Sequence, residues 1–185
     1  MTCRSFRDVC TGTWWQSVEA SVRMTHGPSA CILPIIISSD ETNVRRTGQA
    51  VSYYPVMISI ANIPEALRWQ ETAWSLVALL PSKVTRPGAK PVESARLRRE
   101  MFHRCMELIL RPLLQTEVVN VATGDGASVL AVPVLAMYIA DHPEQCRAAD
   151  IKPHNCTWCD LPRDQYSIPC RVGEERRAAD DSSTG

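Results

Sequence analysis

Residues 30–39 read ACILPIIISS, and Asp40 follows them directly. Apolar side chains, many of them β-branched, occupy almost every position of this run instead of alternating with polar ones. Such a run is typical of a short strand that the rest of the fold covers on both faces. The sequence therefore predicts a buried strand over residues 30–39 that ends at an acidic residue.

Three further apolar runs predict strands around this one. They are YYPVMISIA at 53–61, AWSLVALL at 73–80 and VLAVPVLAMYIA at 129–140, and the last of them ends at a second acid, Asp141. The run at 73–80 also fits a helix, because a short apolar run does not fix the period. The polar residues 42–49 predict a turn between the first two strands.

Residues 94–115 have the clearest helical pattern in the chain. At about 100° per residue, one half of the helical wheel collects Leu97, Met101, Phe102, Cys105, Leu108, Ile109 and Leu113. The other half carries Arg96, Arg99, Glu100, His103 and Glu107. We expect the first half to pack on the sheet and Pro112 to bend or end the last turn.

The composition fits one intracellular, soluble domain. The chain has 185 residues, 45% hydrophobic and 22% charged, which is near the globular average and excludes two large domains. Lys and Arg number 20 and Asp and Glu number 20, so net charge supports neither a nucleic-acid partner nor a membrane partner. No stretch supplies the roughly 20 apolar residues of a membrane span, and the first residues lack the apolar core of a signal peptide. We expect a protein that is not secreted, whose eight cysteines are reduced thiols or metal ligands.

The two strand-end acids, Asp40 and Asp141, are the first candidate site. The order strand, strand, strand, helix, strand is that of a ribonuclease H-like fold, in which the first and fourth strands are neighbours. Two carboxylates at those strand ends would repel each other unless a cation such as Mg²⁺ or Mn²⁺ lay between them. Simpler explanations stay open: Asp40 as a turn acid, and Asp141 as the N-cap of a helix starting at Pro143. A competing acid, Asp125, lies between two glycines and is better explained by a tight turn.

A cysteine cluster is the second candidate site. Cys156 and Cys159 have the two-residue spacing with which a zinc knuckle presents two thiolates. The nearest further candidate ligands are Cys146, His154 and Cys170. The cluster fits a structural zinc site, a partial relic of one, or ordinary reduced thiols. A thioredoxin-like redox pair is disfavoured because prolines flank the motif.

Basic residues gather between positions 83 and 104. The candidates for contact with DNA are Lys83, Arg86, Lys90, Arg96 and Arg99. They fit a surface that follows a DNA backbone. A solvated helix face with its preceding loop explains them equally well.

Six strings in the chain resemble the transposases of fungal Plavaka-type elements, relatives of the CACTA group. They are ILPIIISSDET (32–42), YPVMISIANIPEALR (54–68), AWSLVALLP (73–81), FHRCMELILRPL (102–113), PVLAMYIADHPEQ (133–145) and CTWCDLPRD (156–164). The strings lie in order through most of residues 14–165. The resemblance implies an α/β fold with an incomplete ribonuclease H-like (DDE transposase) core: a mixed sheet, a long helix after the third strand and a Cys-rich insertion.

The resemblance also implies function. Asp40 would be the first catalytic, metal-binding acid and Asp141 the second. The implied cofactors are Mg²⁺ or Mn²⁺ with a structural Zn²⁺, the implied partner is transposon-end DNA without a membrane, and the implied location is the nucleus.

Two departures from the family pattern bear on activity. Glu41 stands where the family pattern has Lys, which places a negative charge beside the metal site. The third acid of a DDE triad lies on a later helix, beyond the Cys-x-x-Cys insertion. Here no acid after Asp141 follows a further strand or lies on a clear amphipathic helix.

We therefore expect a transposase fragment that is inactive alone. Its expected parts are an N-terminal flank at 1–29, a partial core at 30–145, a Cys/His zinc-type insertion at 146–172 and a disordered tail at 173–185. The alternatives are a non-catalytic, zinc-supported module that binds DNA or protein, and a decayed transposon reading frame without function.

Overall fold

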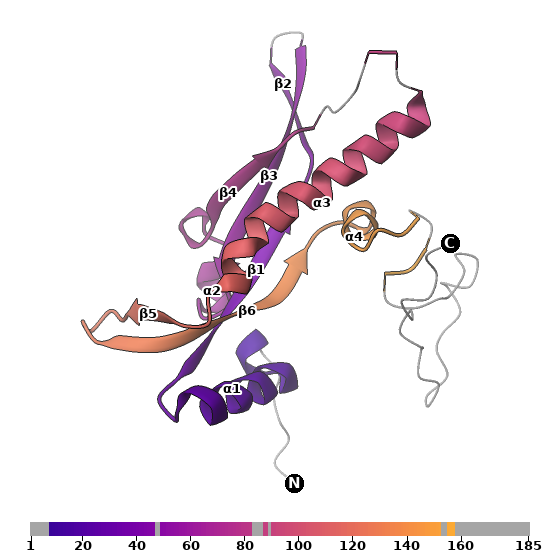
Figure 1. Cartoon of the computed structure of the whole chain (residues 1–185). Coiled ribbons are helices and arrows are strands. Elements are labelled where there is room, and N and C mark those ends of the chain that lie inside the picture. Colours follow the sequence, from indigo (N-terminus) through magenta and orange to yellow (C-terminus); the bar gives the residue numbers. More distant parts are fainter. Residues whose placement is uncertain (1–7, 47–48, 83–86, 89, 153–154, 158–185) are drawn as a thin grey trace, which may run out of the picture.

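Strand β1 (Cys31–Ser39) lies inside a six-stranded mixed sheet (Figure 1). It pairs antiparallel with β3 (Gln49–Ile60) and parallel with β6 (Ser128–Ile139). The strand order is β2-β3-β1-β6-β5, and β4 (Ser75–Leu80) pairs with β3 off this path. Because strands flank β1 on both edges and most of its residues are buried, the prediction of a strand covered on both faces is confirmed.

The computed structural model describes residues 8–46, 49–82, 87–88, 90–152 and 155–157. The remaining elements in these ranges are α1 (Thr13–His26), β2 (Thr42–Arg46), α2 (Glu65–Arg68), α3 (Pro91–Gln115), β5 (Val119–Ala122), α4 (His142–Ala148) and the 3-10 turns Val9–Thr11 and Glu71–Ala73. The predicted zinc-type insertion lies mostly outside the described residues, and the predicted tail lies wholly outside them. No helix in the described part of the chain is long and apolar enough to span a membrane.

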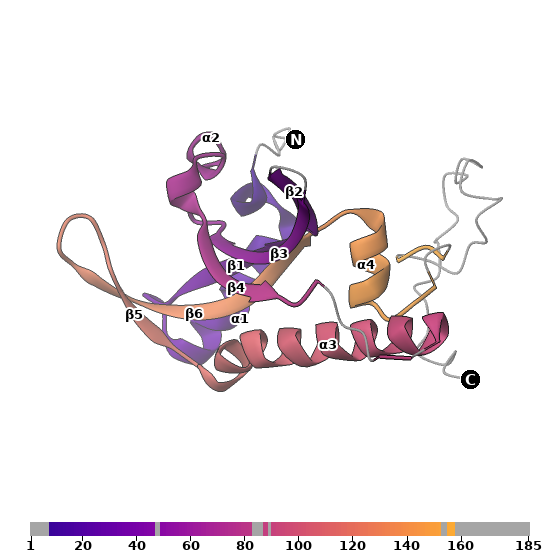
Figure 2. The same cartoon turned by 90° about the horizontal axis from the view of Figure 1, so that it is seen from above.

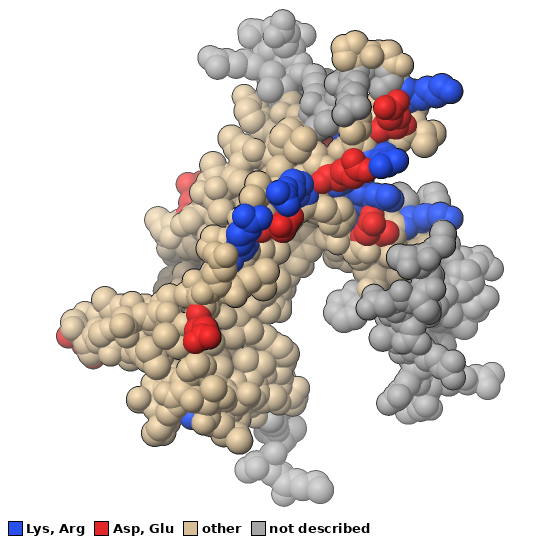
Figure 3. Space-filling view, viewed as in Figure 1, with Lys and Arg blue, Asp and Glu red and all other residues tan. Residues whose placement is uncertain are grey.

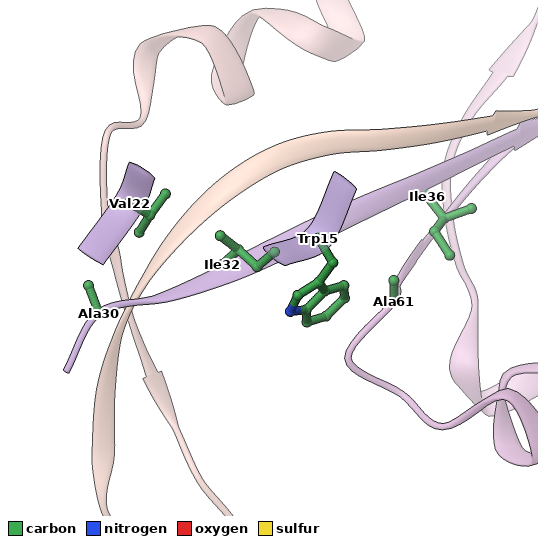
Figure 4. Packing of buried hydrophobic residues seen from close by; sticks show 6 residues of the cluster. All are labelled: Trp15, Val22, Ala30, Ile32, Ile36 and Ala61. Atoms are coloured by element: carbon green, nitrogen blue, oxygen red, sulfur yellow. The ribbon is translucent and has the colours of Figure 1, made fainter. Parts of the chain in front are cut away.

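Helices α1 and α3 pack on opposite faces of the sheet, and Figure 2 shows α3 lying along one of these faces. On one face, Trp15 and Val22 of α1 pack with Ile32 and Ile36, and Figure 4 shows Trp15 between Ile32 and Ala61. On the other face, Phe102 of α3 packs with residues of β1, β3 and β4. Alternate residues of β1 thus supply two separate apolar clusters, which is why its sequence is apolar throughout.

Helix α3 packs through a narrower stripe than the helical wheel predicts. Its contacts with the sheet come from Phe102, Cys105, Met106, Ile109, Leu110 and Leu113. Met101 and Leu108, which were predicted to pack, are exposed. A straight helix on a twisted sheet touches it along about one residue in three or four, so the positions beside that stripe remain in solvent. The helix also continues past Pro112 to Gln115, so this proline lies in the last turn without ending the helix.

The predicted turn at 42–49 is wrong, because Thr42–Arg46 form strand β2. Ser39 pairs with Val56 and Thr42 pairs with Tyr53, so β2 continues the register of β1 along β3. Backbone pairing to a strand that is already placed outweighs the polar composition of this segment. The sequence also gave no signal for α1 or β5, whose positions depend on the sheet they pack on or pair with.

The buried face of β1 provides a stability test. Ile36 is 1% exposed in the α1 cluster, whereas Leu135 of the neighbouring strand β6 is 50% exposed. We expect Ile36→Ala to lower the free energy of unfolding by about 2–5 kcal/mol, because it removes buried methyl groups and leaves a cavity. Leu135→Ala should change it by less than about 1 kcal/mol. Urea denaturation at equal protein concentration measures both, and equal losses would contradict this assignment of the core.

Candidate functional site at the carboxyl ends of β1 and β6

Asp40 and Asp141 lie opposite each other at the carboxyl ends of two neighbouring parallel strands. The β1–β6 register pairs Ser38 with Ile139, and each acid lies two residues further along its strand direction. The prediction that the first and fourth predicted strands are neighbours is therefore confirmed. Both acids are exposed, so their carboxylates are accessible from solvent.

A hydrogen bond joins the two strands just before the acids. The hydroxyl groups of Ser39 and Tyr138 lie 2.6 Å apart, and Ser39 is buried. Burial raises the pKa of Tyr138, while the bond to Ser39 opposes that shift. This cross-strand bond holds the ends of β1 and β6 together beside the two acids.

Asp141 also caps helix α4. Its Oδ1 accepts a hydrogen bond from the backbone N–H of Glu144 at 2.9 Å, and its backbone carbonyl accepts from the N–H of Gln145. The N-cap interpretation is confirmed, and the helix begins at His142, one residue before the predicted Pro143. Because the cap uses Oδ1, the position of this carboxylate depends on the first turn of α4.

Glu144 is a buried acid beside this pair that the sequence pattern did not identify. It is 4% exposed, its Oε1 lies 3.2 Å from Arg147, and its Oε2 has no hydrogen-bond partner among the described residues. Burial raises the pKa of Glu144; Arg147 opposes this shift, and Glu41 and Asp40 add to it. Only the tertiary contacts reveal Glu144, because in the sequence it is an ordinary early residue of a helix.

Arg147 connects α4 to the core and lines a pocket. Its guanidinium carbon lies 5.5 Å from the ring centre of Tyr54 and 5.9 Å from that of Phe102, within the range of cation–π attraction. The pocket has a volume of about 250 Å³ and is lined by Glu41, Tyr54, Leu80, Pro81, Ser82, Arg98, Met101, Phe102 and Arg147. The buried Tyr54 hydroxyl has no hydrogen-bond partner among the described residues. The pocket thus brings together the guanidinium groups of Arg98 and Arg147 and the phenol of Tyr54. They lie beside Glu41, the residue that follows Asp40.

Two of the five residues predicted to contact DNA are paired with acidic side chains. Figure 3 shows acidic and basic side chains alternating along α3. Arg96 pairs with Glu100 at 2.6 Å, and Arg99 pairs with Asp150 at 2.9 Å. Lys90 is exposed at the start of α3, and Lys83 and Arg86 lie outside the described residues. This face of α3 therefore attracts DNA phosphates more weakly than it would if its arginines were unpaired.

Two of the zinc candidates, Cys146 and Cys156, fall within the described residues. Cys146 is 1% exposed on α4, and its Sγ lies 3.5 Å from Nε2 of His142. Burial raises the pKa of the Cys146 thiol, and the nearby Cys156 adds to the shift. His154, Cys159 and Cys170 lie outside the described residues. Over the ranges described, no three His, Cys, Asp or Glu side chains form a group able to hold a metal ion.

Asp125 belongs to a turn, as its glycine neighbours predict. Its carboxylate accepts hydrogen bonds from the Thr123 hydroxyl and, at 3.2 Å, from the N–H of Ala127. These bonds lower its pKa. Asp125 lies in the connection between β5 and β6, at the end of β6 opposite to Asp141.

The family model described as Plavaka transposase matches residues 1–183. No curated protein and no solved structure matches the chain.

The buried Glu144 predicts a pH dependence of stability in metal-free buffer. Its folded-state pKa is raised above the ordinary value of 4.5, so between these two values the folded state holds the proton that the unfolded state has lost. The free energy of unfolding therefore falls as pH rises through that window. Glu144→Gln should match the wild type near pH 4 and become more stable than it as pH increases.

Glu107→Gln is the matched control. Arg104 and Arg111 lower the pKa of Glu107, so this variant should lose stability relative to the wild type as pH increases. Urea denaturation across the pH range measures both differences. The same sign of pH dependence in the two variants would contradict the burial of Glu144.

Proposed function

The chain belongs to the Plavaka transposase family, and on that premise we propose that it forms part of a DDE-type catalytic core. In this proposal Asp40 and Asp141 hold a divalent cation, and the substrate is transposon-end DNA in the nucleus.

The connectivity of the sheet supports a ribonuclease H-like core. Strands β1, β3 and β4 pair antiparallel, α3 follows them, and β6 then returns parallel to β1. This is the arrangement that the family resemblance implies for the catalytic domain. It fits a crossover connection, because a parallel strand cannot be joined to its neighbour by a tight turn.

The observation that carries the proposal is the register that places Asp40 opposite Asp141. Two exposed carboxylates at adjacent strand ends are a donor set that suits Mg²⁺ or Mn²⁺, which often bind one or two carboxylates together with substrate phosphates. A cation bound there would polarise a phosphoryl oxygen and stabilise developing charge. The protein's own part is to hold both carboxylates in place, through the strand register and the α4 cap.

The pocket beside the acids is the best candidate for contact with the DNA strand. Glu41 replaces the Lys of the family pattern, and its charge would repel a phosphate. Arg98 and Arg147 line the same pocket and supply positive charge close to Glu41. We propose that these two guanidinium groups compensate for the missing Lys.

We also propose that this chain does not cleave DNA strands by itself. A two-metal displacement needs more ligands than two carboxylates. Glu144 is a further acid beside this pair, but its Oε1 is paired with Arg147. No group of three possible ligands able to hold a metal occurs in the described part of the chain. We therefore propose that this chain binds a cation and DNA without cutting the strand.

A non-catalytic, zinc-supported binding module is the second candidate function. It is favoured by the contact between Cys146 and His142 and by the proximity of Cys156. The residues proposed to hold Zn²⁺ here are Cys146 and Cys156, with Cys159, His154 and Cys170 as further candidates. If the chain stays unfolded at room temperature with and without zinc, the remaining explanation is that it is a decayed transposon reading frame without function.

A cation-binding experiment tests the first proposal. Because Mn²⁺ would bind between the two carboxylates, we expect Asp40→Asn and Asp141→Asn each to weaken Mn²⁺ binding at least about tenfold, as measured by electron paramagnetic resonance. Asn retains the N-cap of α4, so the second variant should keep its fold. Asp125→Asn, in the distant turn, should leave Mn²⁺ binding unchanged. Equal Mn²⁺ binding by the wild type and the three variants would contradict the proposed metal site.

A cleavage assay tests the inactivity. The purified chain with Mn²⁺ and duplex DNA should give no strand cleavage or joining, because no third carboxylate completes the site among the residues that the structure describes. Metal-dependent cleavage that Asp40→Asn abolishes would overturn this part of the proposal.

A further inference from the structure

We propose that His142 is a zinc ligand together with Cys146 and Cys156, and that zinc bound to α4 fixes the helix whose N-cap is Asp141. The zinc part rests on the second candidate function and is independent of catalysis. The effect on Asp141 also rests on the proposed cation site.

His142 and Cys146 already have the separation of two ligands on one zinc ion. They are four residues apart on α4, so their side chains leave the same face of the helix. Zinc binds sulfur at about 2.3 Å and imidazole nitrogen at about 2.0–2.1 Å in a tetrahedral geometry, which places the two ligand atoms roughly 3.5 Å apart. The observed distance from Nε2 to Sγ is 3.5 Å.

The chain folds back so that Cys156 lies near this pair. The N–H of Ile151 donates to the Cys146 carbonyl at 3.0 Å, which reverses the chain after α4. The Cys146 thiol then faces the carbonyl of Asn155 at 3.6 Å, and the Thr157 hydroxyl donates to Gln145 at 3.3 Å. Both chain neighbours of Cys156 thus contact Gln145 or Cys146.

Zinc would complete this arrangement by drawing in the third ligand. As the described residues lie, these three side chains do not form a group able to hold a metal. Thiolates and imidazole select zinc over Mg²⁺ or Mn²⁺, so this site and the carboxylate pair would take different ions. The three-ligand site would require the Cys156 sulfur to come within bonding distance of a zinc ion held by His142 and Cys146.

The position of His142 links zinc to the carboxylate edge. His142 is the first residue of α4 and follows Asp141 directly. Asp141 holds the first turn through its bond to Glu144, and Cys146 lies in the next turn of the same helix. A zinc ion shared by His142 and Cys146 would brace these two turns and so restrict the Asp141 carboxylate.

Metal titration of the full chain tests the role of His142. Co²⁺ is the spectroscopic probe for the zinc site, and competition with a chromophoric chelator measures zinc affinity. We expect about one zinc per wild-type chain, and at least tenfold weaker binding with altered cobalt absorption for His142→Ala and Cys146→Ser, since even second-shell changes cost 10–100-fold. His26→Ala, at the end of α1, is the matched control and should bind zinc like the wild type.

A second variant keeps the test valid if His142→Ala does not fold. His142→Cys replaces one zinc ligand by another, so it should retain zinc and show stronger thiolate-to-cobalt absorption than the wild type. Zinc affinity and cobalt spectra that stay unchanged in His142→Ala would overturn the role of His142 and leave other ligands to hold the zinc. Absence of zinc from the wild type would overturn the whole zinc site.

Mn²⁺ binding separates the coupling from the cation site itself. We expect the zinc-loaded wild type to bind Mn²⁺ at least about threefold more tightly than the zinc-free protein, and His142→Ala to lose this gain. Equal Mn²⁺ affinity with and without zinc would overturn the coupling alone. No Mn²⁺ binding in either state would overturn the proposed carboxylate site, while the cobalt spectra would still report on His142.

Discussion

The parallel pairing of β1 with β6 is the constraint on which the rest of the structure depends. It joins two segments that are far apart in the sequence, and it requires the crossover that contains β3, β4 and α3. Together with the β1–β3 pairing, it places β1 between two strands, and α1 and α3 cover the two opposite apolar faces. Because the paired strands run in the same direction, their carboxyl ends meet, and so do Asp40 and Asp141.

Contacts of α4 reduce the electrostatic repulsion among the acids at the carboxyl ends of β1 and β6. Buried Glu144 lies close enough to Asp40 and Glu41 for their charges to raise its pKa further. Arg147 opposes that effect, and its guanidinium packs against the rings of Tyr54 and Phe102, which themselves stack at 5.9 Å between centres. One arginine thus offsets part of the negative charge at this edge and holds α4 against the core. A bound cation would relieve the same repulsion.

Helix α4 is short, yet it belongs to both candidate sites. Its cap is the second strand-end acid, its first turn carries His142 and Glu144, and its second turn carries Cys146 and Arg147. Within these seven residues lie groups suited to a hard cation, to zinc and to an aromatic surface. A ligand that ordered this helix would therefore also restrict the carboxylate of Asp141, which caps it.

The sequence by itself determined the central strand, the strands and the helix around it, the acids at two strand ends and the cap at Asp141. These features depend on local patterns: an apolar run, a helical period, and an acid before a proline. Only the tertiary structure decided that Thr42–Arg46 extend the hairpin, that Met101 and Leu108 of α3 face solvent, that Glu144 is buried beside Arg147, and that His142 contacts Cys146. Those outcomes depend on pairing, burial and charge between segments distant in the chain, and such interactions leave no periodic signal in the sequence.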